Sequence, residues 1–178
     1  MPEVPDVPDV PEVPELPELP ELPERLATER LRLILVTLAD AADMRDGRHQ
    51  DRWHRDYPRQ DDRDAATMIH EPSSWGPRHL VHDGLAVGSI GFFGPPEDGE
   101  VEVGYGLVED VRGRGLATEA LRCVLTETDR VGVRVRARTE PTNRASVRVL
   151  AKAGFTELRG SDDEGLLVMG RPLPAAGV

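Results

Sequence analysis

The sequence contains a single cysteine, Cys123, and neither a secretory signal nor an apolar run long enough to span a membrane. One cysteine excludes a disulfide within the chain and is typical of a reducing compartment, so we expect a cytoplasmic location. The N-terminus has no basic stretch followed by an apolar stretch, which a signal peptide requires. No Cys/His cluster has metal-ligand spacing and no Gly-x-Ser-x-Gly elbow occurs, so we expect neither a metal nor that nucleophile.

A basic excess is also missing. The chain carries 33 acidic and 22 basic side chains, a net charge of −11. Residues 1–24 hold eight of the acids and no Lys or Arg, which leaves 25 acids against 22 bases in the remainder. The acidic bias therefore belongs to the N-terminal segment, and nucleic acid is not expected as a partner.

Residues 2–24 repeat every three positions as proline, an acid, and valine or leucine. Proline at this density prevents a helix and favours polyproline II, which has three residues per turn. Two interpretations remain open: a solvated, self-repelling leader, or a strip whose Val/Leu edge docks on another protein surface. We expect an extended or disordered tail over 1–25, one domain over 26–174, and a short C-terminal tail over 175–178.

Hydrophobic periodicity predicts seven strands and four helices in that domain. The strands are expected at 31–38, 79–82, 85–93, 100–108, 131–139, 155–158 and 166–172. The helices are expected from Thr37 or Asp40 to Met44, and at 58–69, 116–128 and 143–153. The order of these elements predicts an α+β fold, an α/β sandwich built on one mixed sheet of six to seven strands with about four helices.

A glycine-rich turn stands between the predicted strand 100–108 and the helix that follows it. The turn reads Arg112-Gly113-Arg114-Gly115-Leu116-Ala117. Backbone N–H groups at a helix start have no partner within the helix, and the helix dipole adds positive potential there. Such a turn is suited to a phosphate or pyrophosphate. The Rossmann spacing and a Gly-Lys-Ser/Thr sequence are both absent.

This turn fits the pattern Arg/Gln-x-x-Gly-x-Gly/Ala, and it resembles the acetyl-CoA pyrophosphate loop of GNAT N-acetyltransferases. A second block, with Asn143, Ser146 and the pair Gly154-Phe155, is similar to the ribosomal-protein acetyltransferase (RimJ/RimL-like) branch. The opening residues 28–35 also resemble the first strand of that branch. The resemblance covers roughly residues 27–172.

The resemblance implies acetyl-CoA as co-substrate and two central strands that splay apart to admit its pantetheine arm. The glycines at 104 and 106 are consistent with the close approach of a ligand or backbone there, or with a bulge that holds no ligand. The implied cofactor-binding residues are Leu107, Val108, Arg112, Gly113, Arg114, Gly115, Leu116, Ala117, Thr118, Asn143 and Ser146.

For the catalytic base we nominate Glu102. Alternation along the strand places it on one face with Glu100, and the valines on the other. The alternative is a solvated strand face on which both acids serve only solubility. Ser146 lies one turn into its helix, where it would meet the CoA sulfur. Many relatives carry a tyrosine at the position of Leu150. Without it, Ser146 is a weak substitute as proton donor, water could protonate the thiolate, or the thiolate could leave as such.

We expect an N-acetyltransferase that moves acetyl directly from acetyl-CoA to a primary amine, either a protein N-terminus or a small molecule. The alternatives are a catalytically weak GNAT-fold module that binds acyl-CoA, and an interaction protein that recruits partners through its tail. Homodimers are common among such relatives. Cys123 is expected to be a small buried hydrophobe. Packing or surface roles rather than catalysis are expected of Trp53, Tyr57, His70, Trp75 and His82.

Overall fold

The computed structural model describes residues 19–175, which form one eight-stranded mixed sheet in the order β1-β2-β3-β4-β5-β6-β8-β7. Only β5 and β6 run parallel; the other neighbours are antiparallel. The strands are β1 (Arg25–Ala27), β2 (Arg32–Leu35), β3 (Arg78–His82), β4 (Leu85–Phe92), β5 (Glu100–Leu107), β6 (Arg134–Thr139), β7 (Glu157–Ser161) and β8 (Leu167–Arg171).

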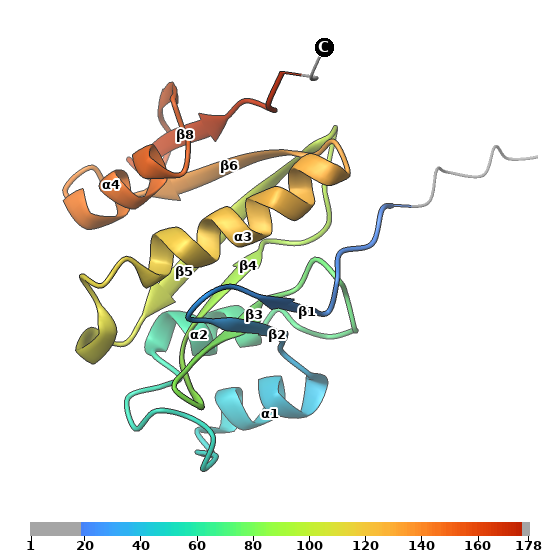
Figure 1. Cartoon of the computed structure of the whole chain (residues 1–178), viewed down its shortest axis with the longest axis vertical. Helices are drawn as coiled ribbons and strands as arrows, with labels where there is room; N and C mark the ends of the chain where they lie inside the picture. Colours follow the sequence, from blue (N-terminus) through green and yellow to red (C-terminus); the bar gives the residue numbers. More distant parts are fainter. Residues whose placement is uncertain (1–18, 176–178) are drawn as a thin grey trace, which may run out of the picture.

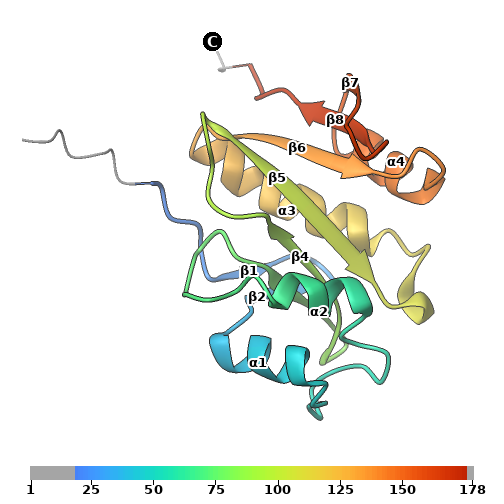
Figure 2. The same cartoon turned by 180° about the vertical axis from the view of Figure 1, so that it is seen from behind.

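Helices lie on both faces of this sheet (Figures 1 and 2). The α3 and α4 helices pack together on one face, over β5 and β6. The α2 helix lies on the opposite face with α1 beside it. The helices are α1 (Leu38–Asp46), α2 (Gln60–Ala66), α3 (Leu116–Arg130) and α4 (Arg144–Lys152), with a 3-10 turn, η1 (Glu109–Val111), before α3. None of the helices within residues 19–175 combines the length and apolarity that crossing a bilayer requires.

The predicted α+β fold on a mixed sheet is confirmed, with one strand more than expected. The additional strand is β1, which pairs with β2 in a short hairpin. The predicted strand 31–38 ends earlier because Thr37 begins α1: its side chain accepts a hydrogen bond from Asp40 N, and Asp40 caps Thr37 in return. This reciprocal capping box fixes the helix start.

The central strands part as the resemblance implied. The β4 and β5 strands stay paired in one register from Gly88↔Leu107 to Phe92↔Val103, without a bulge. The β5 and β6 strands, in contrast, pair only from Glu100↔Arg134 to Glu102↔Arg136. Both strands continue beyond that point, so a gap opens between the second half of β5 and the end of β6.

The core lies between the sheet and its helices and includes most of the aromatic side chains. Trp53, Tyr57 and Trp75 are buried there, which confirms packing for these three. His82 is half-buried, and its ring nitrogen lies 3.1 Å from the Arg30 carbonyl. Cys123 is only half-buried against the core, because it lies at the edge of the buried stripe of α3. Cys123 was expected to be a small buried hydrophobe, and it packs against the core as a partly buried one.

A buried polar chain joins α1 to β3. The Tyr57 hydroxyl lies 2.8 Å from His79 Nδ1, and His79 Nε2 lies 3.4 Å from Asp40 Oδ2, both within hydrogen-bond distance. All three side chains are almost fully buried. Burial alone would raise the pKa of Asp40, but hydrogen bonds from His79, Thr37 and Gln50 outweigh it and hold the pKa far below its ordinary value. The carboxylate thus stabilises the fold in its ionised form.

Replacing Asp40 with asparagine is expected to lower the free energy of unfolding at pH 7 by about 3 kcal/mol, because a buried partner of His79 loses its charge. The folded-state pKa lies below the unfolded value of about 3.9, so this contribution is complete above that pH and is lost as the pH falls through the folded pKa. Urea denaturation from pH 7 to pH 2 should show the two proteins converging at low pH. The exposed Asp46→Asn on the same helix should change little; equal losses would contradict the assignment.

Candidate functional site

The glycine-rich turn is an exposed loop that leads directly into α3. Residues 112–115 are all exposed, and the helix begins at Leu116. Gly113 and Gly115 have φ values of +76° and +80°, a left-handed conformation that favours glycine. A β-carbon on Gly113 would meet no atom within 4 Å. Glycine is therefore favoured there by the backbone conformation and not by crowding, and the space in front of the residue is open.

The loop presents amides without partners. Within residues 19–175, the N–H groups of Gly113, Arg114 and Gly115 donate to no acceptor, and α3 has no side-chain cap. The first amides of α3 are also free of intrahelical bonds by geometry. Together they form a concentrated set of outward donors at the positive end of a 15-residue helix. This arrangement is suited to the two phosphates of a diphosphate.

The hairpin of β1 and β2 holds this loop from behind, a contact that the sequence reasoning missed. Arg30 donates from Nη1 to the Arg114 carbonyl at 2.8 Å and from Nε to Glu119 Oε2 at 2.7 Å. Thr28 donates to the other oxygen of Glu119. Burial would raise the pKa of Glu119, but the hydrogen bonds from Thr28 and Arg30 outweigh it and hold the pKa below its ordinary value. Arg30 therefore fixes the loop against the first turn of α3.

The two arginines of the loop are partly committed to its own backbone. Arg112 Nε donates to the Leu107 carbonyl at 2.9 Å, and Arg114 Nη2 donates to the Asp110 carbonyl at 3.1 Å. These bonds brace the loop and occupy part of both guanidinium groups, whereas the backbone amides of residues 113–115 have no partner among the described residues.

The end of β5 offers one free amide to the gap. Val108 donates its N–H to Val87 at 2.8 Å, and its carbonyl accepts from Val111, so neither backbone group of Val108 is free. Because successive amides alternate in direction along a strand, the N–H of Leu107 points away from β4 and into the gap. Of the two residues predicted to contact the cofactor here, only Leu107 presents an amide.

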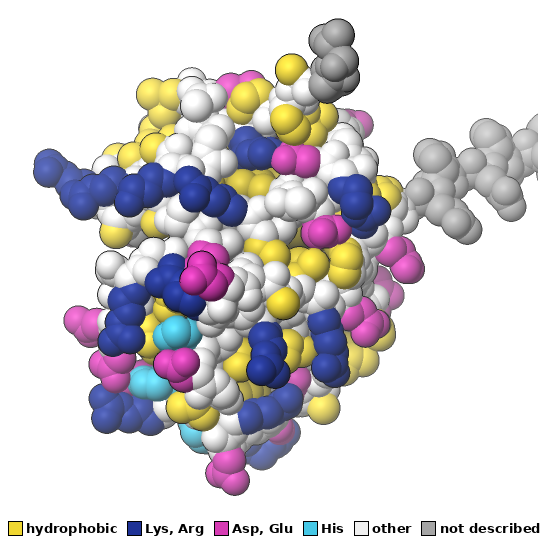
Figure 3. Space-filling view, viewed as in Figure 1, with side chains coloured by type: hydrophobic (Ala, Val, Ile, Leu, Met, Phe, Trp, Pro, Cys, Tyr) yellow, Lys and Arg dark blue, Asp and Glu magenta, His cyan; other side chains and the backbone are white. Residues whose placement is uncertain are grey.

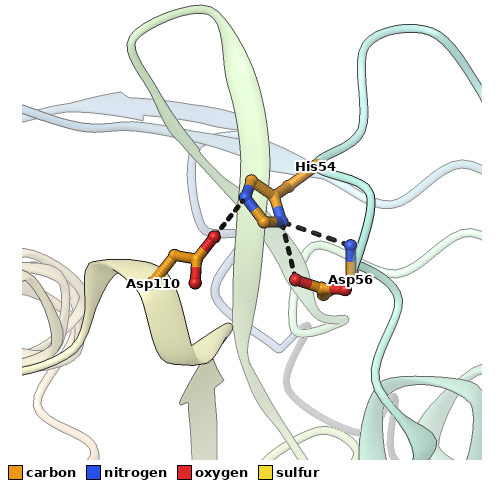
Figure 4. A group of neighbouring side chains, drawn as sticks. All are labelled: His54, Asp56 and Asp110. Carbon is orange, nitrogen blue, oxygen red and sulfur yellow. Dashed lines mark hydrogen bonds and ion pairs between the residues drawn. The ribbon is translucent and has the colours of Figure 1, made fainter.

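A histidine links the loop between α1 and α2 to the turn before the glycine-rich loop (Figure 4). His54 Nε2 lies 3.4 Å from Asp110 Oδ2, and His54 Nδ1 accepts from the Asp56 amide at 3.2 Å. One atom of each of these three residues lies within 4.8 Å of the others, a spacing that a metal ion would accept. Arg55 already donates to Asp110 Oδ2 at 3.0 Å, so the carboxylate has a cationic partner. We interpret the cluster as a brace for η1.

Glu102 lies where β5 and β6 begin to separate. Its Oε1 accepts from Arg138 Nε at 2.7 Å, and its Oε2 accepts from Arg136 Nε at 3.2 Å. Its side chain is only 10% exposed. A carboxylate offers about four lone pairs, so one on each oxygen remains for a water molecule or an amine. Glu100, its neighbour on the same face, is paired with Arg159.

A cavity of about 290 Å³ lies beside Glu102 on the face of the sheet opposite α3. Acidic side chains dominate its lining, and the Phe93 ring is 54% exposed there. The lining residues are Phe93, Pro95, Glu97, Asp98, Glu100, Val101, Glu102, Arg134 and Arg136. The glycines of β5 leave space for two side chains on this face. A β-carbon on Gly104 would lie 2.8 Å from Phe93, and one on Gly106 would collide with the Arg59 guanidinium.

On the other face, Tyr105 reaches across to the start of α4. Its hydroxyl lies 3.1 Å from Ser146 Oγ and 3.3 Å from the Ser146 carbonyl oxygen, and its one proton can be donated to either. Asn143 caps this helix by accepting from Ser146 N at 3.0 Å, as its predicted N-cap role requires. Burial raises the pKa of Tyr105 above its ordinary value, with the hydrogen bond to Ser146 opposing the rise. Tyr105 therefore keeps its proton at neutral pH, and the sequence reasoning missed this pair.

Basic side chains form a row along the exposed face of α4. Arg144, Arg148 and Lys152 stand four residues apart, so they share one side of the helix, and all three are exposed. Figure 3 shows Lys and Arg side chains as a dark blue row across α4. Among the described residues none of the three makes an ion pair, so the row adds positive potential to the face that carries α3.

The acetyltransferase (GNAT) domain family matches residues 30–156, and the chain belongs to this family. No curated protein sequence matches the chain. Its fold is similar to that of a GnaT-family acetyltransferase from Bordetella pertussis, described as putative, with 25% identity and a TM-score of 0.62 over 84% of this chain and 100% of that one.

Two further solved structures share the fold. One is Mycobacterium smegmatis RimJ in complex with CoA-disulfide, with 23% identity and a TM-score of 0.55 over 79% of this chain and 80% of that one. The other is RimL, a ribosomal L7/L12 alpha-N-protein acetyltransferase in complex with coenzyme A, with 17% identity and a TM-score of 0.65 over 86% and 100%. The resemblance inferred from the sequence is confirmed, and acetyl transfer is the activity of the family.

Proposed function

We propose that the chain is an acetyl-CoA-dependent N-acetyltransferase that moves acetyl directly to a primary amine, a protein N-terminus or a small molecule. The observation that carries this proposal is the set of unpartnered amides at the start of α3, next to the gap between β5 and β6. The diphosphate of acetyl-CoA fits the amides from Gly113 to Thr118, and the pantetheine arm fits the gap. Coenzyme A in the related RimJ and RimL structures supports the same ligand.

The residues around the gap suit the two proton transfers of the reaction. The amine nitrogen attacks the thioester carbonyl carbon, and the carbon–sulfur bond breaks. The amide of Leu107 polarises the carbonyl oxygen. Glu102 takes the proton of the amine through a water molecule, using the lone pairs that Arg136 and Arg138 leave free. Ser146 donates its hydroxyl proton to the departing sulfur and receives the proton of Tyr105.

The acceptor is proposed to be a cationic amine that enters the cavity beside Glu102. Four carboxylates line that cavity against two arginines, and the exposed Phe93 ring offers a face to an ammonium group. Incubation with acetyl-CoA and a library of peptides and amines, followed by mass spectrometry and thiol release, tests the proposal. Acetylated amines with stoichiometric thiol release are expected. Acetyl-CoA binding without any transfer would contradict catalysis and favour the acyl-CoA-binding alternative.

Arg30→Ala is expected to raise the KM for acetyl-CoA about 10-fold with little change in kcat, because the loop loses a charge-assisted hydrogen bond but keeps its amides. Arg130→Ala is the matched control, since it removes an arginine–glutamate pair from the last turn of the same helix, at 3.0 Å from Glu127. Steady-state kinetics with varied acetyl-CoA measure both. An unchanged KM in Arg30→Ala would remove Arg30 from the account.

Tyr105→Phe is expected to lower kcat about 10-fold while leaving the KM for acetyl-CoA nearly unchanged, since the hydroxyl supplies a proton rather than a binding contact. The effect should be smaller with an acetyl thioester whose thiol is more acidic, because that leaving group needs no donor. Ser146→Ala should show the same dependence on the leaving group. An effect of equal size with every thioester would mean that Tyr105 only packs against α4.

A further inference from the structure

The last units of the N-terminal repeat are seated on the domain, on a surface outside the candidate site. Figure 1 shows this segment in blue where it runs into β1. Trp75 Nε1 donates to the Pro20 carbonyl at 3.0 Å, and Leu22 N donates to Ser74 Oγ at 3.2 Å. The Leu22 side chain is 5% exposed and belongs to the core. Leu22 therefore packs on the chain's own domain, whereas most of the repeat, residues 1–18, lies outside the described residues, so neither interpretation of the repeat is tested.

A buried arginine completes this surface. Arg78 is 0% exposed, and its guanidinium donates to the carbonyls of Pro23 at 2.7 Å, Ser74 at 2.8 Å and Gly76 at 3.1 Å. Within the described residues it has no carboxylate partner, and its Nε has no acceptor. Burial lowers the pKa of Arg78 to about 10. A charge buried in this way needs every available acceptor, so the Pro23 carbonyl is part of what satisfies it.

The contacts are of the kind that proteins use to bind polyproline ligands. In such complexes an indole N–H donates to a proline carbonyl, and the side chains that repeat every third residue face the binding surface. The Trp75 ring is itself fixed against Phe92, with 5.3 Å between ring centroids. The segment contributes only proline carbonyls, a leucine amide and a leucine side chain. None of these groups distinguishes one unit of the repeat from another.

The chain carries three identical units of this ligand. Pro14-Glu15-Leu16, Pro17-Glu18-Leu19 and Pro20-Glu21-Leu22 follow one another, and Pro23 comes next. The third unit is seated, and Leu19, which ends the second unit, is 52% exposed; residues 1–18 lie outside the part of the chain that the structure describes. We propose that Ser74, Trp75 and Arg78 form a polyproline-recognition site for which each of the three Pro-Glu-Leu units is an equivalent ligand, so that the segment can slip by three residues.

The structure defines what a slip would change. Shifted by one unit, Leu19 takes the place of Leu22, and the Pro20 carbonyl takes the place of Pro23 at Arg78. The Glu24 carbonyl accepts from Leu35 N at 3.0 Å, and this bond fixes the start of β1. Three residues would therefore loop out between the recognition site and β1. Closing so short a loop costs strain as well as entropy, and this cost is set against that of leaving the buried Arg78 guanidinium without an acceptor.

Aspartate substitutions in the full-length chain test this proposal. Leu22→Asp removes the seated ligand but leaves two intact units. The triple variant Leu16→Asp/Leu19→Asp/Leu22→Asp removes all three. The double variant Leu16→Asp/Leu19→Asp adds more charge than the single variant but keeps the seated unit, so it controls for charge. The urea midpoint and the acrylamide quenching of Trp75, in a Trp53→Phe background, report on the site.

If the segment slips, Leu22→Asp should lower the urea midpoint by less than about half as much as the triple variant does. Trp75 should stay protected from acrylamide in Leu22→Asp. The triple variant should show about twofold or greater quenching of Trp75, and the double variant should match the parent. Equal losses in the single and triple variants would overturn the proposal, because Leu22 alone would then be the ligand. If an aspartate variant fails to fold, the corresponding alanine series gives the same contrast with smaller losses.

Discussion

Replacing Gly113 with alanine is expected to weaken acetyl-CoA binding by about 100-fold. The left-handed conformation at φ +76° costs a residue with a β-carbon about 1–2 kcal/mol, so the loop shifts toward another backbone conformation. That shift turns amides away from the diphosphate, and each hydrogen bond to a charged group contributes about 1.5–3 kcal/mol. Calorimetric titration with acetyl-CoA measures the loss directly.

The chain provides a closely matched control in Gly132, in the turn between α3 and β6. Its φ is +73°, and a β-carbon there would also meet no atom within 4 Å. Gly132→Ala therefore introduces the same backbone strain and should lower stability to a similar degree, but it should leave acetyl-CoA affinity unchanged. If both variants bound acetyl-CoA as the parent does, the loop would not be the diphosphate site.

Glu102→Gln is expected to lower kcat by about 100-fold or more, because the amide cannot accept the proton of the attacking amine. Acetyl-CoA affinity should change less than about twofold, since Glu102 lines the cavity proposed for the acceptor and not the glycine-rich loop. Glu100→Gln is the matched control: it lies two residues away on the same strand face and is also paired with an arginine, Arg159. Steady-state kinetics across pH 6–10 compare the two variants.

These variants separate catalysis from structure. If Glu102 served only to pair with Arg136 and Arg138, both glutamine variants would show the same modest loss of activity and stability. A large loss of kcat confined to Glu102→Gln, together with a changed pH dependence, supports the base. Rescue of activity at high pH, where the amine is already neutral, would add a readout that a purely structural role does not give.

Alternation and helical periodicity predicted the faces of β5 and the existence of the helices, because neighbouring residues determine these features. Alternation placed the valines of β5 toward the core and Glu102 on the opposite face, and three of the four residues on the core side, Val101, Val103 and Leu107, are buried. Helix α3 runs two residues past its predicted end and β6 starts three residues late, because a turn at Gly132, with φ +73°, separates them. Helix α2 covers only 60–66 of the predicted 58–69, and hydrogen bonds in the single turn that follows it end at Ile69.

The contacts that the sequence did not predict join residues far apart in the chain. Arg30 and the Arg114 carbonyl are separated by 84 residues, and Tyr105 and Ser146 by 41. Each partner taken alone reads as an ordinary surface or strand residue, and only the fold brings the pair together. The glycine-rich loop could be predicted from the sequence because its glycines and the helix start are adjacent in the chain.

Amide chemical shifts test the central claim most directly. We propose that main-chain N–H groups from Gly113 to Thr118 bind the diphosphate of acetyl-CoA. Two-dimensional ¹H–¹⁵N spectra recorded during a titration with coenzyme A should show large, saturable shifts for Gly113, Arg114 and Gly115, which S-acetylpantetheine does not reproduce. Saturable binding of coenzyme A that leaves these three amides unchanged would contradict it.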